Sequence, residues 1–257
     1  MIDPTAIIDA DAIVDPDVSI GPWSVIGAGV EIGAGSWIGS HVVLKGPTRI
    51  GTNNKIYHFC SIGEDPQDQK FQPVSNSTLV IGDNNVIREY CSINRGTDHG
   101  GGVTSLGDSN WIMAYCHIAH DCRVGNHTIF ANNATLAGHV EIHDFAILGG
   151  FTGVHQYCRM GEGAFSAIAA IIVKDVPPFI VVEGNTARAR TINREGLKRR
   201  GVEGEIIAKL KRAYKTLYRQ GLPLHEALVQ LEADGGGVAQ IGRMVAFIQE
   251  SSRGIVR

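Results

Sequence analysis

The sequence is dominated by an aliphatic residue that recurs at every sixth position. Three such series follow one another, and only Phe130 and Ser166 break their aliphatic character. A glycine often follows the aliphatic residue, where a tight corner needs its conformational freedom. So short a repeat predicts brief strands joined by corners and stacked as a solenoid. The series are Ile8, Val14, Ile20, Ile26, Ile32, Ile38, Leu44, Ile50, Ile56 and Ile62; Ile81, Ile87 and Ile93; and Leu106, Ile112, Ile118, Val124, Phe130, Leu136, Ile142, Leu148, Val154, Met160, Ser166 and Ile172.

The register of the repeat shifts between successive series, so each gap must hold an insertion. The insertions fall at about 64–80 and at about 94–105. Loops inserted into a repeat scaffold tend to carry function, because the stacked repeats mainly pack against each other. We therefore expect functional residues in both loops.

All five cysteines occupy one position of the repeat, two residues before the aliphatic side chain. Elsewhere this position holds small or β-branched residues such as Val18 and Thr48. The pattern predicts small buried core residues and no disulfides or metal ligands. The five are Cys60, Cys91, Cys116, Cys122 and Cys158.

The repeat ends after Lys174, and a separate helical domain is predicted at 187–257, which leaves 1–186 to the repeat. Apolar periodicity predicts three helices. They are expected at about Glu203–Gln220, Pro223–Glu232 and Val238–Ser251, with a break at Gly235–Gly237.

The first of these helices has a basic outer face that includes Lys211 and Arg212. Together with the run Lys198, Arg199 and Arg200 it forms one basic region in a chain of net charge -3. Such a region either is merely solvated or attracts an acidic protein partner.

Composition and charge exclude several classes of protein. A hydrophobic content of 44% indicates a folded core, and the net charge of -3 gives no global reason to expect nucleic-acid binding. No apolar stretch approaches the roughly 20 residues that span a bilayer, and the N-terminal segment does not resemble a signal peptide. We expect a cytoplasmic protein with no membrane span.

Three histidines recur at nearly the length of one coil, which is about 18 residues for three hexads. His120, His139 and His155 are separated by 19 and 16 residues, with Gln156 beside the last and His117 just before the first. Stacked imidazoles could ligate zinc, or one could act as a general base while others bind substrate. The spacing leaves both chemistries open.

Five segments stand out as longer motifs. They are HIAHDC at 117–122, NNATLAGHV at 132–140, VHQ at 154–156, DVPP at 175–178 and NREGLKRRG at 193–201. With these segments the chain resembles the UDP-N-acetylglucosamine acyltransferases, a family of hexapeptide-repeat transferases. The likeness covers the whole chain, and its most specific part lies in the C-terminal region.

The resemblance implies a mainly β fold, a left-handed parallel β-helix with a small C-terminal α-helical domain. It implies that an (R)-3-hydroxyacyl group moves from acyl carrier protein to the 3-hydroxyl of UDP-N-acetylglucosamine, in lipid A (lipopolysaccharide) synthesis. It also implies a homotrimer that needs no cofactor and no metal.

Three residues match the catalytic positions of the family. His120 is implied as the general base, and Asp121 as the residue that orients it, although strand neighbours point apart and a corner would be required. Gly138 is implied as the residue whose backbone N–H faces the developing oxyanion.

Further residues match positions that line the family's cleft between subunits. Lys70 suits a phosphate, because its ammonium is a compact point charge. The positions are Asp68, Gln69, Lys70, His117, His139, His155, Gln156, Asn193, Glu195, Arg199 and Arg200.

Three departures from the family pattern concern the substrates. Ile168 stands where long-chain members have glycine, which predicts a shortened acyl groove and a donor of about ten to twelve carbons, since pockets discriminate single methylenes. Gln69 and Asn94 replace a usual leucine and histidine, which leaves a 3-amino sugar nucleotide open as acceptor.

Three alternatives remain. The N-acyltransferase of the same pathway carries an additional N-terminal nucleotide-binding domain, whereas the hexads here begin at Ile8. A zinc carbonic anhydrase of the same fold would use the histidines as ligands. A non-catalytic scaffold would leave the histidine column unexplained.

Overall fold

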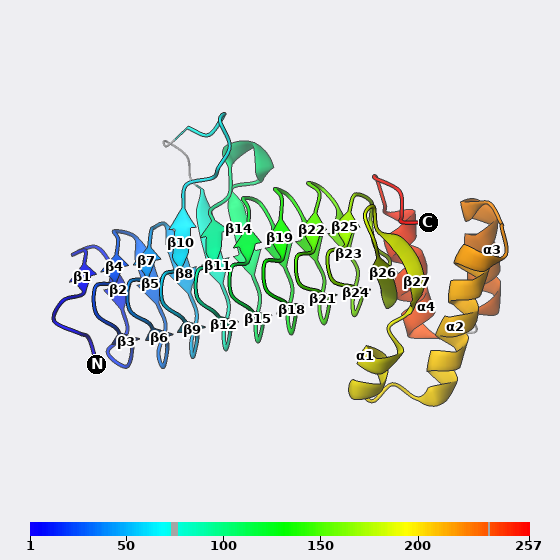
Figure 1. Ribbon diagram of the computed structural model, residues 1–257, viewed down its shortest axis with the longest axis horizontal. Helices are drawn as coiled ribbons and strands as arrows, with labels where there is room; N and C mark the ends of the chain where they lie inside the picture. Colours follow the sequence, from blue (N-terminus) through cyan, green and yellow to red (C-terminus); the bar gives the residue numbers. More distant parts are fainter. Residues whose placement is uncertain (73–76, 236) are drawn as a thin grey trace.

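A computed structural model describes residues 1–72, 77–235 and 237–257. Figure 1 shows a long column of coils with a group of helices at its C-terminal end. Residues 73–76 of the first predicted loop, and Gly236 of the predicted helix break, lie outside the described residues.

Three sheets make up the column, and the described strands are assigned to them in spatial order. The first sheet holds β1 (Ile7–Ile8), β4 (Val25–Ile26), β7 (Val43–Leu44), β10 (Ser61–Glu64), β13 (Ser92–Asn94), β16 (His117–Ile118), β19 (Thr135–Leu136), β22 (Gly153–Val154) and β25 (Ile171–Ile172). The second sheet holds β2 (Ile13–Val14), β5 (Val30–Ile32), β8 (Thr48–Ile50), β11 (Thr78–Ile81), β14 (Val103–Leu106), β17 (Arg123–Val124), β20 (Glu141–Ile142) and β23 (Arg159–Met160). The third sheet holds β3 (Ser19–Ile20), β6 (Trp37–Ile38), β9 (Lys55–Ile56), β12 (Val86–Ile87), β15 (Trp111–Ile112), β18 (Ile129–Phe130), β21 (Ile147–Leu148), β24 (Phe165–Ser166), β26 (Ile180–Glu183) and β27 (Arg188–Ile192).

Each coil gives one strand to each sheet, so a strand pairs in parallel with its counterpart in the next coil. β16 and β19, for example, pair Ile118 with Leu136, 18 residues further along. β27 differs, because it runs antiparallel to β26 at the C-terminal end of the column. The result is a triangular prism with three flat faces and three corners.

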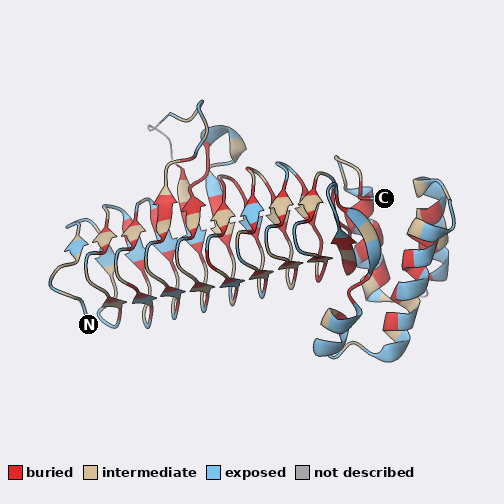
Figure 2. Ribbon diagram, viewed as in Figure 1, coloured by how far each residue is buried: buried red, intermediate tan, exposed pale blue. Residues whose placement is uncertain are grey.

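The aliphatic series forms the core of the prism. Buried positions recur in coil after coil of the column in Figure 2. Ile38, Leu44 and Ile62 are completely buried, and burial of each such side chain contributes roughly 1.5–3 kcal/mol. Phe130 and Ser166 are buried in the same way, and the Ser166 hydroxyl lies 2.8 Å from Oγ1 of Thr152. All five cysteines are free and buried, which confirms that they are core residues.

A ladder of polar side chains runs through the interior near the corner between the second and third sheets. Oδ1 of Asn54 accepts from Nδ2 of Asn85 at 3.0 Å, and Oδ1 of Asn85 accepts from Nδ2 of Asn110 at 2.9 Å. The Thr128 hydroxyl donates to Oδ1 of Asn110 at 2.6 Å. These bonds satisfy polar groups whose burial would otherwise destabilise the column.

Two loops leave the column at the corner between the first and second sheets. One connects β10 to β11, and the other connects β13 to β14 and contains the short helix η1 (Asp98–Gly100). Figure 1 shows both loops rising from the same side of the column. Both insertions therefore lie on the edge of the prism that all the turns from the first to the second sheet form.

The C-terminal region holds α1 (Arg194–Arg199), α2 (Gly204–Arg219), α3 (Leu224–Asp234) and α4 (Ala239–Gln249) among the described residues. The last three confirm the helices predicted from periodicity. α1 was not predicted; it is short and is capped by Asn193, whose side chain accepts the N–H of Gly196 at 3.0 Å. None of the described helices has the length and apolar character needed to span a bilayer.

The chain end returns to the column and ties the two parts together. Asp175 is 1% exposed and accepts from Nε of Arg159 at 3.1 Å and from the Ser251 hydroxyl at 2.7 Å. Its backbone also bonds to Gly254 and Val256. Glu162, on a turn of the column, pairs with Arg200 and with Arg243 of α4.

Candidate active site

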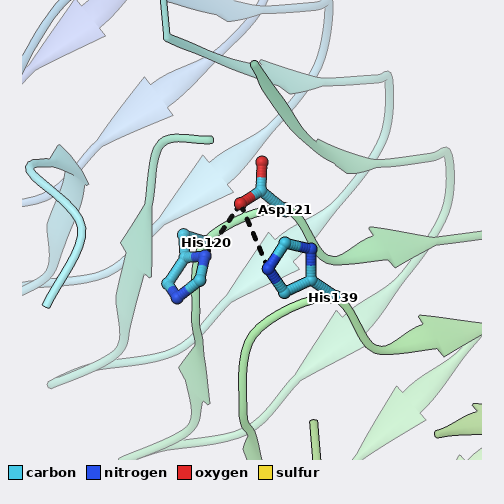
Figure 3. A group of neighbouring side chains, drawn as sticks. All are labelled: His120, Asp121 and His139. Atoms are coloured by element: carbon cyan, nitrogen blue, oxygen red, sulfur yellow. Dashed lines mark hydrogen bonds and ion pairs between the residues drawn. The ribbon is translucent and has the colours of Figure 1, made fainter. Parts of the chain in front are cut away.

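His120 and Asp121 occupy the corner that follows β16. The φ of Asp121 is +58°, a left-handed conformation that turns the chain sharply. The two neighbouring side chains therefore meet, and Nδ1 of His120 lies 2.8 Å from Oδ2 of Asp121 (Figure 3). The corner that the sequence required for this contact is present.

Asp121 is almost fully buried and surrounded by hydrogen-bond donors. The Thr97 amide donates to Oδ1 at 2.8 Å, and the Thr97 hydroxyl donates to Oδ2 at 2.6 Å. Burial alone would raise the pKa of Asp121, but hydrogen bonds from His120 and Thr97 hold this pKa below its ordinary value. The residue is therefore an anion in the folded protein.

His139 lies one coil further along the same corner. Its ring is 5.1 Å from that of His120 and at 89° to it, and its Nε2 is 3.7 Å from Oδ2 of Asp121 (Figure 3). Burial lowers the pKa of His139, although the charges of Asp121 and Asp68 oppose the shift. Asp68 of the first loop thus acts on the same site. The ring of His139 also stacks on Tyr157 at 4.3 Å.

Gly138 is buried directly against the imidazole of His120. A Cβ at Gly138 would lie 2.5 Å from Cε1 and 2.7 Å from Nε2 of His120, so a larger residue would displace the ring. The neighbouring amides of Ala137 and His139 bond to carbonyls of adjacent coils at 3.0 and 3.1 Å. The amide of Gly138 donates to no acceptor among the described residues, which leaves it available to a ligand.

His117 faces outward from β16 on the first sheet. Its Nδ1 lies 2.7 Å from the Ser92 hydroxyl on the neighbouring strand β13. Burial lowers the pKa of His117, and the positive charge of a protonated His120 lowers it further. His117 is therefore suited to binding as a neutral imidazole.

His155 and Gln156 are exposed at the same corner, further toward the helices. Nδ1 of His155 lies 3.4 Å from Nη2 of Arg253, which the returning chain end supplies. In the first loop, Oδ1 of Asp68 accepts the backbone N–H of Lys70 at 2.9 Å. Gln69 and Lys70 extend their side chains into solvent.

The C-terminal candidates lie elsewhere on the molecule. A cavity of about 500 Å³ lies between α1 and the third sheet. Its lining includes Asn193, Glu195 and Arg199 on one side, and Ile147 and Phe165 of the third sheet on the other. In a triangular prism the third face lies opposite the corner between the first and second faces. A single chain therefore does not bring the histidine corner and the α1 cavity together.

Two of the C-terminal candidates contact the column. Asn193 caps α1, and its Nδ2 donates to the carbonyl of Gly163 at 2.9 Å. Arg200 pairs with Glu162, and its guanidinium lies 4.0 Å above the ring of Phe145. Both residues therefore also hold α1 against the column.

Ile168 lies on the turn between β24 and β25, at the corner between the third and first sheets, and is 72% exposed. A Cβ at Gly150, on the same corner one coil earlier, would lie 4.0 Å from Cγ1 of Ile168.

The residue pattern alone did not identify Ser92, Thr97, Gly100 or Thr104, all of which contact a candidate residue. Thr97, Gly100 and Thr104 lie in the second insertion, and that insertion was the available signal. A loop inserted at a corner must contact the residues of the neighbouring turns at the same corner. Ser92 follows Cys91 within the regular repeat and gives no such signal.

His120, Asp121 and His139 are, among the described residues, the group whose ligand atoms lie close enough to hold a metal ion, all within 4.8 Å of one another. Oδ2 of Asp121 already accepts from His120 and Thr97, and Oδ1 accepts from the Thr97 amide. Each oxygen of this carboxylate therefore already has a hydrogen-bond donor within the chain. The arrangement fits an oriented imidazole.

Comparison with known proteins matches two regions to family models. Residues 104–138 match the bacterial transferase hexapeptide (six repeats), and residues 175–256 match domain 2 of UDP-N-acetylglucosamine O-acyltransferase. The acyl-(acyl-carrier-protein)–UDP-N-acetylglucosamine O-acyltransferase of Thiobacillus denitrificans is 52% identical over 204 residues, which are 79% of this chain and 79% of that protein. The protein of the same name from Burkholderia orbicola is 50% identical over 212 residues, 81% of this chain and 80% of that one.

Solved structures agree with the sequence relatives. The UDP-N-acetylglucosamine acyltransferase of Francisella novicida superposes with a TM-score of 0.97 at 43% identity, over 100% of this chain and 94% of that one. The enzyme from Bacteroides fragilis gives 0.98 at 38% identity, with full coverage of both chains. With the three parallel sheets, these matches confirm the left-handed parallel β-helix. The chain belongs to the UDP-N-acetylglucosamine O-acyltransferase family.

Proposed function

We propose that this protein transfers an (R)-3-hydroxyacyl group from acyl carrier protein to the 3-hydroxyl of UDP-N-acetylglucosamine, an early step of lipid A synthesis. The observation that carries the proposal is the arrangement of His120, Asp121 and Gly138 in a chain of this family. Relatives at about half identity bear the name of this reaction.

His120 acts as the general base. Its Nδ1–H donates to the Asp121 carboxylate, so Nε2 carries the free lone pair and takes the proton of the sugar 3-hydroxyl. The sugar oxygen attacks the thioester carbonyl carbon as that proton leaves. A positioned base of this kind is typically worth about 10²- to 10⁴-fold in rate.

Gly138 supports the second half of the step. Its amide donates to no acceptor among the described residues, and the residue lies against the His120 ring, so this amide suits the oxygen that becomes negative when the tetrahedral intermediate forms. Collapse of the intermediate breaks the C–S bond, and the imidazolium returns the proton to the carrier thiolate. The transfer balances without a redox partner, so the proposal includes no cofactor and no metal.

The separation of the two groups of candidate residues supports a homotrimer as part of the proposal. The histidine corner of one chain and the α1 cavity with Glu195 and Arg199 lie on opposite sides of the prism. A second copy that set its third face against the first chain's corner would complete one cleft with both groups. Three such contacts close a ring, and the closed symmetry is common among homo-oligomers.

Substrate contacts follow from the same cleft. We assign Asp68, Lys70 and His155 to the sugar nucleotide and the pantetheine arm of the carrier protein, and Arg199 to a phosphate. Since acyl carrier protein is a cytoplasmic thioester carrier, the proposal places the enzyme in the cytoplasm. Gln69 and Asn94 keep a 3-amino sugar nucleotide as an alternative acceptor.

The test is transfer of labelled 3-hydroxydecanoyl from acyl carrier protein to UDP-N-acetylglucosamine by the natural protein and by His120→Ala. We expect robust ester formation that falls by about 10²-fold or more in the variant. Equal rates would remove His120 as the base. Amide formation with a 3-amino acceptor alone would favour the N-acylation alternative, and no transfer to either acceptor would overturn the proposal.

A further inference from the structure

The second inserted loop closes over the carboxylate of Asp121. Thr97, in this loop, is completely buried, and it donates to both oxygens, through its amide to Oδ1 at 2.8 Å and through its hydroxyl to Oδ2 at 2.6 Å. Asp121 is itself 5% exposed. One residue therefore sets the plane of this carboxylate.

Neighbours of Thr97 hold Asp121 from other sides. Gly100 of η1 lies so close that a Cβ there would collide with the Asp121 carboxylate. Oγ1 of Thr104 accepts the backbone N–H of Asp121 at 2.7 Å. The loop thus fits Asp121 closely.

The start of the loop is anchored to the first inserted loop. Nδ2 of Asn94 donates to the carbonyl of Asp65 at 2.9 Å, and Arg95 pairs with the Asp65 carboxylate and with the carbonyl of Gly46. Asn94 and Arg95 are both buried. These contacts leave Thr97 little freedom to move.

We infer that Thr97 is a positioning residue for the proposed acyl transfer. Its hydroxyl and amide hold Asp121 in the orientation that accepts Nδ1–H of His120, and this choice of tautomer leaves Nε2 unprotonated beside Gly138. Which ring nitrogen of a histidine carries the proton is set by the hydrogen bond that the other nitrogen makes. The inference rests on the proposed function, because only a base at Nε2 makes the tautomer matter for the rate.

The experiment compares Thr97→Val with Thr97→Ser in the transfer assay. Valine keeps the volume and the backbone amide but removes the hydroxyl, whereas serine restores a donor. Because hydrogen bonds to charged groups are stronger than those between neutral groups, we expect kcat to fall by about tenfold or more in Thr97→Val. KM for the sugar nucleotide should stay within about twofold, and Thr97→Ser should recover most of kcat.

Thr128→Val is the matched control. Thr128 is also completely buried and its hydroxyl donates at 2.6 Å, but to Asn110 in the structural ladder at a different corner. Both valine variants should lower the urea midpoint, whereas only Thr97→Val should lower kcat. An equal loss of kcat in both variants, or none in either, would overturn the inference.

A second measurement does not depend on turnover. Nitrogen-15 chemical shifts of the His120 side chain in the resting protein report its tautomer, and we expect the Nδ1–H form in the natural protein and a mixture in Thr97→Val. An unchanged tautomer in Thr97→Val would contradict the inference. Failure of the natural protein to transfer acyl groups, with the tautomer shift intact, would instead contradict the proposed function.

Discussion

His120 donates from Nδ1 to Oδ2 of Asp121 at 2.8 Å, although the two residues are adjacent in the chain. The contact exists because Asp121 adopts a left-handed conformation at the corner, where both side chains turn toward the same edge of the prism. Substitution of either residue should therefore show how much this hydrogen bond contributes to the transfer rate.

Asp121→Asn should lower kcat by about 10²- to 10⁴-fold, because an amide can present an N–H to Nδ1 and favour the wrong tautomer of His120. The assay is carrier-dependent transfer at saturating sugar nucleotide. His143→Gln, at a different corner, is the control for the change of a polar side chain. If Asp121→Asn had the same kcat as the natural protein, Asp121 would not orient His120 for catalysis.

Gly138→Ala should lower kcat by about 10²-fold, since the added Cβ would lie 2.5 Å from Cε1 of His120 and would push the ring away. Gly242→Ala in α4 is the control, because its Cβ would meet no atom within 4 Å. Full activity in Gly138→Ala would show that the ring position does not limit the reaction.

Ile168→Gly should shift donor preference from about ten or twelve carbons toward fourteen, since each buried methylene is worth about 0.8 kcal/mol. The side chain is 72% exposed in the single chain, so the urea midpoint should change little. Competition between 3-hydroxydecanoyl and 3-hydroxymyristoyl donors measures the preference. A natural enzyme that already prefers the longer donor would rule out Ile168 as the ruler.

Asp175→Ala should lower the free energy of unfolding by about 3–5 kcal/mol. The substitution leaves the guanidinium of Arg159 without its carboxylate partner and removes the hydrogen bond from Ser251 in the returning chain end. Urea denaturation measures this loss. Glu205→Ala, which breaks an exposed pair with Lys209, should change the free energy by less than about 1 kcal/mol. Similar losses in both variants would contradict a special role for Asp175.

His117 should make stability depend on pH. Its pKa in the folded protein is lowered by burial, whereas the unfolded chain titrates near 6.5. The unfolded chain therefore binds more protons between these two pKa values, so the stability that His117 contributes is fully present above about pH 7 and falls as the pH drops below about 6.5.

His117→Gln should flatten this slope, as measured by urea midpoints at about pH 7.5, 6.5 and 5.5. His225→Gln, on an exposed side chain of α3, controls for the loss of a histidine. A slope that is the same in His117→Gln and in the natural protein would show that His117 does not contribute to it.

Much of the architecture could be predicted from local pattern. The spacing of Ile38, Leu44 and Ile50 determines which side chains point inward, because a corner every six residues returns each aliphatic side chain to the interior. The same periodicity assigned the cysteines to the core. α1 escaped prediction because six residues are too few to show a helical period, and its N-cap at Asn193 depends on a contact with Gly163.

The sequence by itself determined the coil, the position of both insertions, the helices α2 to α4 and the column of histidines, because each follows from a repeat distance along the chain. Only the tertiary structure decided that Thr97, 24 residues before Asp121, holds its carboxylate, and that Gly138 lies against Nε2 of His120. It also decided that the α1 cavity lies opposite the histidine corner. Such relationships depend on how far each loop reaches and which way each corner turns, and the spacing of residue types carries neither.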